Sequence, residues 1–451
     1  MNDVKNFLEA AGRVKPSQRQ LDWLDIGIYG FIHFGVNTFT DREWGLGSED
    51  PAIFDPKELD CDQWVAAARS AGMKGLILTA KHHDGFCLWP SKYTEHSVKN
   101  SPFRGGKGDV VRELSDACRR GGIKFGFYLS PWDRNSPLYG TDAYNDYYKA
   151  QLTELLTGYG DIFMVWFDGA CGEGPNGRKQ EYDFPGYIEL VRKYQPNACM
   201  FNDFGPDVRW IGNESGTARF AEWAVMPVEL TYRAEVQTGP GPLYEEGALG
   251  HVYNTQPELG AISNILPSSG LCFCPAETDM SIRNGWFWHA EEEPHSLERL
   301  RHTYMTSAGG NSALNLNIPP DRRGLIDERD VKRLKELGDW LRSAFGNAIN
   351  GEKTVTGPAH RPVYEISFPE KRRVGYIVLG EDIAEGQRVE TFIVSCRDEY
   401  GQWSAVYNGT TIGNRRIVKI NKNTDAVQVK ITFARGDVSL KNISVYEEAE
   451  E

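Results

Sequence analysis

Residues 62–80 read DQWVAAARSAGMKGLILTA and join a helical pattern to a short apolar run. The pattern predicts a helix over 62–72 that ends at Gly72, because glycine readily adopts the left-handed conformation that closes a helix. The run from Gly75 to Ala80 predicts a buried strand. A helix that leads directly into a buried strand is the repeating unit of a parallel sheet covered by helices.

The same alternation extends in both directions along the chain. It predicts further strands over 26–33, 123–129 and 161–167, with helices over 109–120, 142–157 and 186–194. Less regular strands are expected at 199–202, 219–224, 270–274 and 313–317, and helices at 295–307 and 327–344. Eight strands with helices between most of them predict an α/β fold, a (β/α)₈ TIM-like barrel over residues 1–346.

The pattern changes after Gly346. Six β-rich segments occupy 374–379, 389–395, 405–407, 416–420, 427–433 and 439–446. They predict an all-β sandwich over residues 347–451. We expect the sandwich to support the barrel rather than to bind a ligand, because it contains a single tryptophan, Trp403, and no visible cluster of solvent-facing aromatic residues.

Composition excludes several classes of protein. The 451 residues include 50 Lys and Arg against 63 Asp and Glu, a formal net charge of -13, which argues against a nucleic-acid binder. The eight cysteines form no CxxC pair, so no zinc ribbon or thioredoxin-type site is predicted. The N-terminal stretch lacks the apolar run of a signal peptide, and no segment approaches the ~20 apolar residues of a membrane helix. We therefore expect a cytoplasmic protein without a membrane partner, or an exported one if a leader has been removed.

Polar and aromatic residues follow the predicted strands. His33 ends the first strand, His82 and His83 follow the second, Tyr128 ends the third, and Asp168 follows the fourth. A later loop carries Glu214. Each of these residues taken alone fits a structural role, but the ends of barrel strands meet at one face, so together they predict an active site.

Two kinds of chemistry suit this set of residues. A metal site is the lesser alternative, because neighbouring residues such as His82 and His83 point to opposite faces of a strand and no H-x-H pair is present. Glycoside hydrolysis needs two carboxyl groups and a ring of hydrogen-bonding side chains. Asp168, rigidly presented at a strand end, is the expected nucleophile, and Glu214 on a loop is the expected acid. No metal and no cofactor is predicted.

Several segments resemble the bacterial α-L-fucosidases of glycoside hydrolase family 29. They are YGFIHFGVNTFTDREWG (29–45), KGLILTAKHHDGFCLWPSKYTEHSV (74–98), KFGFYLSPWDR (124–134), MVWFDGA (164–170), WIGNESG (210–216) and ETDMSIRNGWFW (277–288), and the β-rich segment GEDIAEGQRVETFIV (380–394) is also similar. The W-x-G-N-E-x-G segment resembles the branch of the family that acts on α-1,3 and α-1,4 linkages.

This resemblance implies a retaining exo-α-L-fucosidase that releases fucose from Lewis-type glycans through a covalent fucosyl–enzyme intermediate. It assigns the nucleophile to Asp168 and the acid/base to Glu214, whose carboxyl groups should then lie about 5–5.5 Å apart. The residues expected to contact the sugar are His33, His82, His83, Tyr128 and Trp286, with Glu43, Trp44, Trp166 and Arg283 as additional candidates. The alternatives are another retaining glycosidase of the same barrel type and a catalytically inactive carbohydrate-binding barrel.

Overall fold

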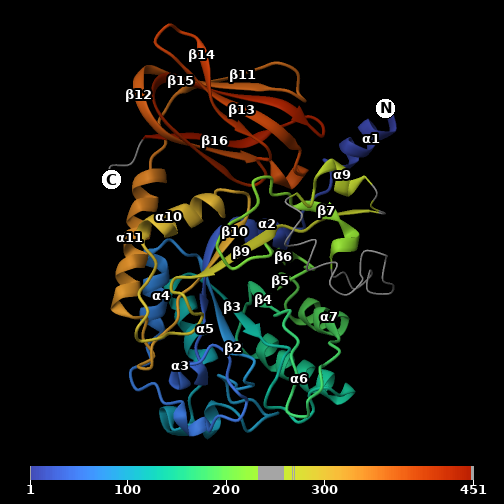
Figure 1. Ribbon diagram of the computed structural model, residues 1–451, viewed down its shortest axis with the longest axis vertical. Helices are drawn as coiled ribbons and strands as arrows, with labels where there is room; N and C mark the ends of the chain where they lie inside the picture. Colours follow the sequence, from blue (N-terminus) through green and yellow to red (C-terminus); the bar gives the residue numbers. More distant parts are fainter. Residues whose placement is uncertain (1, 232–257, 267, 269, 448–451) are drawn as a thin grey trace.

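A closed barrel of eight parallel strands forms the larger part of the computed structural model, which describes residues 2–231, 258–266, 268 and 270–447 (Figure 1). The strands follow the order β1-β10-β9-β6-β5-β4-β3-β2 around the barrel. Their bounds are β1 Ile28–Ile32, β2 Gly75–Lys81, β3 Lys124–Leu129, β4 Met164–Trp166, β5 Cys199–Asn202, β6 Val208–Trp210, β9 Ala276–Ser281 and β10 Ala313–Asn317. The predicted barrel is therefore confirmed.

Helices cover the outside of the barrel and begin at clear sequence signals. Asp60 caps α4 by accepting from the backbone amides of Asp62 and Gln63, and Asp109 caps α5 in the same way. The helices are α1 Asn2–Ala11, α2 Gln18–Leu24, α3 Val36–Thr40, α4 Cys61–Ser70, α5 Val110–Gly121, α6 Asp142–Gly158, α7 Phe184–Tyr194, α9 Ile262–Ile265, α10 Leu297–Thr306 and α11 Glu328–Phe345. None of the helices in the described part of the chain is both long and apolar enough to cross a bilayer.

Two of the eight predicted barrel strands are wrong. Residues 219–224 form a turn and loop, and the strand β8 (Leu271–Phe273) pairs outside the barrel with the antiparallel strand β7 (Val225–Pro227). The barrel positions belong to β6 and β9 instead. The sequence of β9, AETDMS, carries Glu277, Asp279 and Ser281, all buried, so it lacks the continuous apolar run that marks a buried strand.

The C-terminal region is an antiparallel β-domain with its own apolar core. Its strands are β11 Glu352–Thr356, β12 Val363–Glu381, β13 Val389–Arg397, β14 Trp403–Gly409, β15 Arg416–Ala434 and β16 Leu440–Glu447. The predicted segments 416–420 and 427–433 are parts of the single long strand β15, while β11 and the first half of β12 were not predicted. Breaks in register divide β12, so that its two halves pair differently and the sheet folds around one core.

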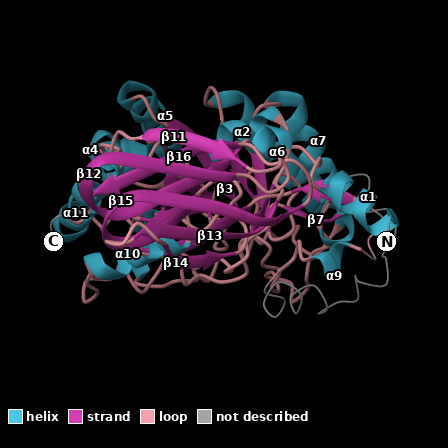
Figure 2. Ribbon diagram, turned by 90° about the horizontal axis from the view of Figure 1, so that it is seen from above, coloured by secondary structure: helices cyan, strands magenta, loops and turns pink. Residues whose placement is uncertain are grey.

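The β-domain packs against the parts of the barrel that precede its strands. Figure 2 shows strands β12, β13 and β15 running side by side next to the helices of the barrel. Asn311, just before β10, accepts from the amide of Asn414, and the amide of Ile417 donates to Gly309. The β-domain also contacts the segment that follows β6, where the hydroxyl of Thr411 donates to the carbonyl of Glu222.

Candidate active site

Asp168 is held rigidly at the carboxyl end of β4. The hydroxyl of Tyr128, from the neighbouring strand β3, donates to Oδ2 of Asp168 at 3.0 Å, and the backbone amide of Ala170 donates to Oδ1 at 2.7 Å. The Asp168 side chain nevertheless keeps 22% of its surface exposed. The carboxylate is thus fixed in orientation but open to a ligand.

His83 faces this carboxylate and has a defined tautomer. Its Nε2 lies 3.8 Å from Oδ2 of Asp168. Its Nδ1 lies 2.7 Å from the hydroxyl of Ser130, which donates its only proton to the carbonyl of Trp132. Nδ1 of His83 therefore carries the proton, and Nε2 is left as a hydrogen-bond acceptor beside Asp168.

The other two histidines are fixed by asparagine side chains. His33 Nδ1 donates to Oδ1 of Asn317 at 2.9 Å, because the amide nitrogen of Asn317 already donates to Ser281 and Trp286. The amide nitrogen of Asn37 donates to Nδ1 of His82 at 3.3 Å, which places the proton of His82 on Nε2. The three rings thus offer two acceptors and one donor.

All three histidines are neutral near pH 7 in the folded protein. Burial lowers the pKa of His33 to about 3 and lowers the pKa of His82 and of His83 below the usual value. A neutral imidazole accepts or donates a single hydrogen bond through its second nitrogen, whereas a cation only donates. The site is therefore suited to an uncharged ligand with several hydroxyl groups.

Glu214 joins the same set of side chains through Trp286. It lies exposed on the loop that follows β6, and the indole Nε1 of Trp286 donates to its Oε2 at 3.2 Å. The Trp286 ring lies 5.0 Å from that of His33, and the His33 ring lies 5.6 Å from that of His82. The His82 ring in turn stacks on Tyr128, so touching side chains lead from Glu214 to Asp168.

Glu43 positions the loop that carries Trp286. Its carboxylate accepts from the backbone amides of Trp286 and Phe287 and from the imidazole of His289. Although burial opposes the charge of His289, its hydrogen bonds to Asp41 and Glu43 raise its pKa. Glu43 thus connects two loops at the mouth of the barrel.

The three remaining candidates occupy different surroundings. Trp44 is 58% exposed and meets the rings of His83 and Trp132 edge-on. Trp166 is buried, stacks on Phe201 at 4.1 Å and donates to Glu277. Arg283 is only 1% exposed, and Asp330 and Asp327 pair with its guanidinium, so its placement favours support of the Trp286 loop over contact with the sugar.

Three acidic residues near the site were not predicted from the sequence. Glu277 and Asp279 point into the barrel from β9, and Asp203 follows β5. Burial raises the pKa of Glu277 to about 7, while burial together with the charge of Glu277 raises that of Asp279. The position of Asp203 at a strand end was the available signal, but the phenylalanine and glycine that follow it resemble an ordinary turn.

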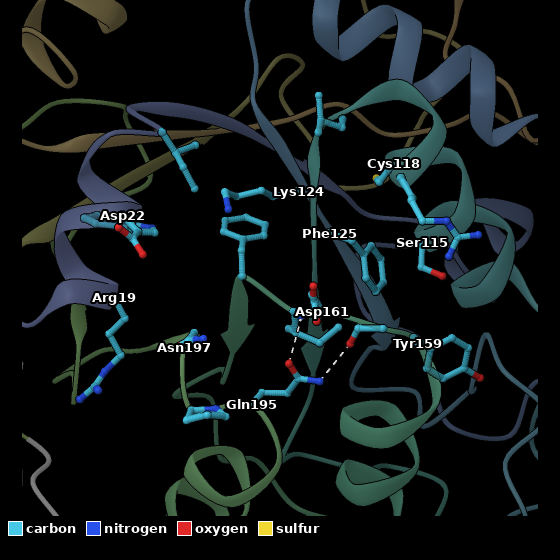
Figure 3. A pocket seen from close by; sticks show the side chains of 18 of the residues that line it. Arg19, Asp22, Ser115, Cys118, Lys124, Phe125, Tyr159, Asp161, Gln195 and Asn197 are labelled. Atoms are coloured by element: carbon cyan, nitrogen blue, oxygen red, sulfur yellow. Dashed lines mark hydrogen bonds between the residues drawn. The ribbon is translucent and has the colours of Figure 1, made fainter.

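In the described part of the chain, neither a metal site nor the cavity at the opposite end of the barrel competes with these residues. No group of three or more His, Cys, Asp or Glu residues that suits a metal ion occurs among the described residues. A cavity of about 960 Å³ opens at the starts of β3 and β4, bordered by Arg19, Asp22, Lys124, Phe125 and Asp161 (Figure 3). It contains none of the candidate residues and lies at the face of a barrel that serves stability rather than catalysis.

Two carboxyl groups among neutral histidines and tryptophans at the mouth of a TIM-like barrel fit the active site of a glycoside hydrolase. The sequence profile of the family described as Alpha-L-fucosidase matches residues 37–346. Alpha-L-fucosidase 1 of Arabidopsis thaliana is 38% identical over 465 residues, which cover 96% of this chain and 87% of the plant protein. The chain belongs to the α-L-fucosidase family, glycoside hydrolase family 29, and is an α-L-fucosidase.

Solved structures agree with this membership. A glycoside hydrolase 29 family member from an unknown rumen bacterium is 39% identical, with a TM-score of 0.85 over 98% of this chain and 78% of that chain. A Ruminococcus gnavus GH29 fucosidase in complex with fucose is 28% identical, with a TM-score of 0.83 over 97% of this chain and 96% of that chain. The similarity therefore covers both the barrel and the β-domain.

Proposed function

We propose that the enzyme is a retaining exo-α-L-fucosidase that removes terminal α-1,3- or α-1,4-linked fucose from branched, Lewis-type glycans. The observation that carries the proposal is the partly exposed carboxylate of Asp168, fixed by Tyr128 and Ala170 at the end of β4. The preference for these linkages rests on the W-x-G-N-E-x-G segment around Glu214.

Asp168 acts as the nucleophile in the proposed mechanism. One of its oxygens attacks the anomeric carbon while Glu214 protonates the departing glycosidic oxygen, and a covalent fucosyl–enzyme forms. Glu214 then removes a proton from water, which attacks the same carbon and releases fucose with its original configuration. The hydrogen bond from Trp286 steers Glu214 toward the ring of histidines.

The neutral histidines bind the sugar in this proposal. His33 and His83 each present an unprotonated Nε2 that accepts from a fucose hydroxyl, and His82 presents an N–H that donates to one. Fucose lacks a 6-hydroxyl group, and the partly exposed ring of Trp286 supplies an apolar surface for its methyl group.

The first test compares nitrophenyl α-L-fucoside with a Lewis trisaccharide and follows the anomer released by NMR. We expect α-L-fucose as the first product from the trisaccharide, and faster cleavage of the trisaccharide than of the aryl fucoside. Initial release of the β anomer would contradict retention, and cleavage of the aryl fucoside alone would contradict the linkage preference.

The second test replaces the proposed nucleophile. Asp168→Ala should abolish turnover, and added azide should restore it with a fucosyl azide of inverted configuration as the product, because azide fills the space of the missing carboxylate. Turnover of this variant close to that of the wild type would exclude Asp168 as the nucleophile.

A further inference from the structure

A second carboxyl group lies beside the residue that follows Asp168. Asp203 is the first residue after β5, which pairs with β4 in the barrel through Trp166 and Phe201. A Cβ atom built on Gly169 would come within 2.7 Å of Oδ1 of Asp203. The carboxyl group therefore occupies the space that a side chain at position 169 would need.

Among the described residues, none besides Asp203 itself is a hydrogen-bond partner of this carboxyl group. The Asp203 side chain is half-buried. A polar group that is partly withdrawn from water without a partner raises the free energy of the folded protein, and a bound ligand can remove that cost. Asp203 is thus placed to meet a ligand that enters beside Asp168.

The charges around Asp203 favour its neutral form. Asp168, which follows β4, is the charged side chain that acts on Asp203. Burial and the negative charge of Asp168 raise the pKa of Asp203 to about 7. Burial and the neighbouring charge therefore favour the neutral carboxylic acid of Asp203 below about pH 7.

We propose that Asp203 is a substrate-binding residue that donates a hydrogen bond from its neutral carboxylic acid to an oxygen of the sugar bound against Asp168. The proposal rests on the proposed role of Asp168. Asp203 keeps its proton throughout, so the acid/base steps remain those of Glu214. Ionisation of Asp203 removes the donor and places a second negative charge beside the nucleophile.

The test measures kcat/KM against pH with an aryl fucoside whose leaving group departs without acid assistance, which suppresses the contribution of Glu214 to the alkaline limb. For the wild type we expect a constant value near pH 6 and a loss approaching tenfold per pH unit above about 7. Asp203→Asn keeps a donor that does not ionise, so the alkaline limb should disappear while the value near pH 6 falls about threefold. Asp203→Leu should lose about tenfold or more at pH 6, because the donor is gone.

Asp161→Asn is the matched control, since Asp161 precedes β4 at the opposite end of the barrel and should leave the profile unchanged. An alkaline limb that persists in Asp203→Asn, or full activity of Asp203→Leu, would overturn the proposal. A purely structural role would lower the unfolding temperature of both variants without moving the pH profile, and this too would overturn it.

A second measurement does not depend on the variants folding. Infrared spectra of the wild type should show the carbonyl band of a buried carboxylic acid that shifts when fucose binds at pH 6 and is lost as the pH rises past 7. The absence of any ligand-dependent shift would contradict the hydrogen bond. Failure of azide to rescue Asp168→Ala would instead contradict the proposed nucleophile, so the two failures are distinguishable.

Discussion

Single neighbours decide the chemistry of the residues at the mouth of the barrel. Ser130, Asn317 and Asn37 each set the tautomer of one histidine, and burial keeps all three rings neutral. If the histidines bind the sugar as proposed, a change at one of these partners would alter which hydroxyl group the ring accepts from or donates to. The hydrogen-bonding role of each histidine therefore depends both on the histidine itself and on the partner that fixes its tautomer.

Glu214→Gln tests acid catalysis at this scale. The amide does not protonate the leaving oxygen, so kcat/KM for the Lewis trisaccharide should fall by roughly 10²- to 10⁴-fold, with a far smaller loss for an activated aryl fucoside. Steady-state rates over a series of leaving groups measure the difference. Glu291→Gln, an exposed carboxylate on the Trp286 loop, is the control, and an equal loss for all leaving groups would contradict acid catalysis by Glu214.

Glu277→Gln tests the buried carboxyl group inside the barrel. The pKa of Glu277 is raised to about 7 in the folded state, above that of an unfolded glutamate, so its contribution to stability is present at low pH and is lost as the pH rises through about 7. Relative to the wild type, the variant should therefore gain on the order of 2–3 kcal/mol of unfolding free energy between pH 4.5 and 7.5.

Urea unfolding at several pH values measures this difference. Glu399→Gln, on an exposed turn of the β-domain, should show no such change. A constant difference between Glu277→Gln and the wild type across this range would show that Glu277 is ionised in the folded enzyme.

At the scale of elements, loops from distant parts of the chain hold one another at the site. The loop between β9 and α10 carries Trp286, and it is tied to the loop after α3 by Glu43 and to α11 by Arg283. Arg283 pairs with Asp330 at 2.8 Å, and both side chains are fully buried. The position of Trp286, and through it that of Glu214, thus depends on an ion pair outside the site.

Arg283→Met should break this arrangement by leaving Asp330 buried without its partner. We expect the free energy of unfolding to fall by about 3–5 kcal/mol, and the double variant Arg283→Met/Asp330→Leu to recover most of the loss. Lys335→Met removes an exposed pair with Asp339 on the same helix and should change stability by less than about 0.5 kcal/mol. Chemical denaturation compares the four proteins, and equal effects of the two single changes would contradict the role of the buried pair.

At the scale of the whole molecule, the barrel and the β-domain share apolar packing. Val378 of β12 and Ile417 of β15 belong to the same buried cluster as the barrel strands, and the side chain of Gln387 accepts from the amide of Ala224. The N-terminal segment also contacts the β-domain, since the carbonyl of Gly12 accepts from Arg388. The β-domain is therefore an integral part of the fold rather than an appended module.

We expect the two regions to unfold together. Calorimetry should show one transition, and Ile417→Ala, which removes buried apolar atoms at the interface, should lower the unfolding free energy of the whole protein by about 2–5 kcal/mol. Tyr400→Ala, at an exposed turn between β13 and β14, should leave the transition in place. Two resolved transitions, with only one shifted by Ile417→Ala, would contradict shared packing.

Local signals in the sequence were sufficient for much of this protein. The strands β1 to β4 contain apolar runs, and the helices next to them begin at capping residues or end at glycine. Such signals lie within a few residues of one another, so the barrel could be predicted from the sequence, as could the fucosidase motifs. The assignment of Asp168 and Glu214 to catalysis and the domain boundary near residue 346 remain predictions.

Tertiary structure alone decided the rest. The buried Glu277 of β9 is satisfied by hydrogen bonds from Tyr29, Trp166 and Asn315, which lie on three other strands. Arg283 contacts Asp330 only in the folded chain. Asp203 contacts Gly169 only when β4 and β5 pair. Such contacts join residues far apart in the chain, and no short stretch of sequence contains both partners.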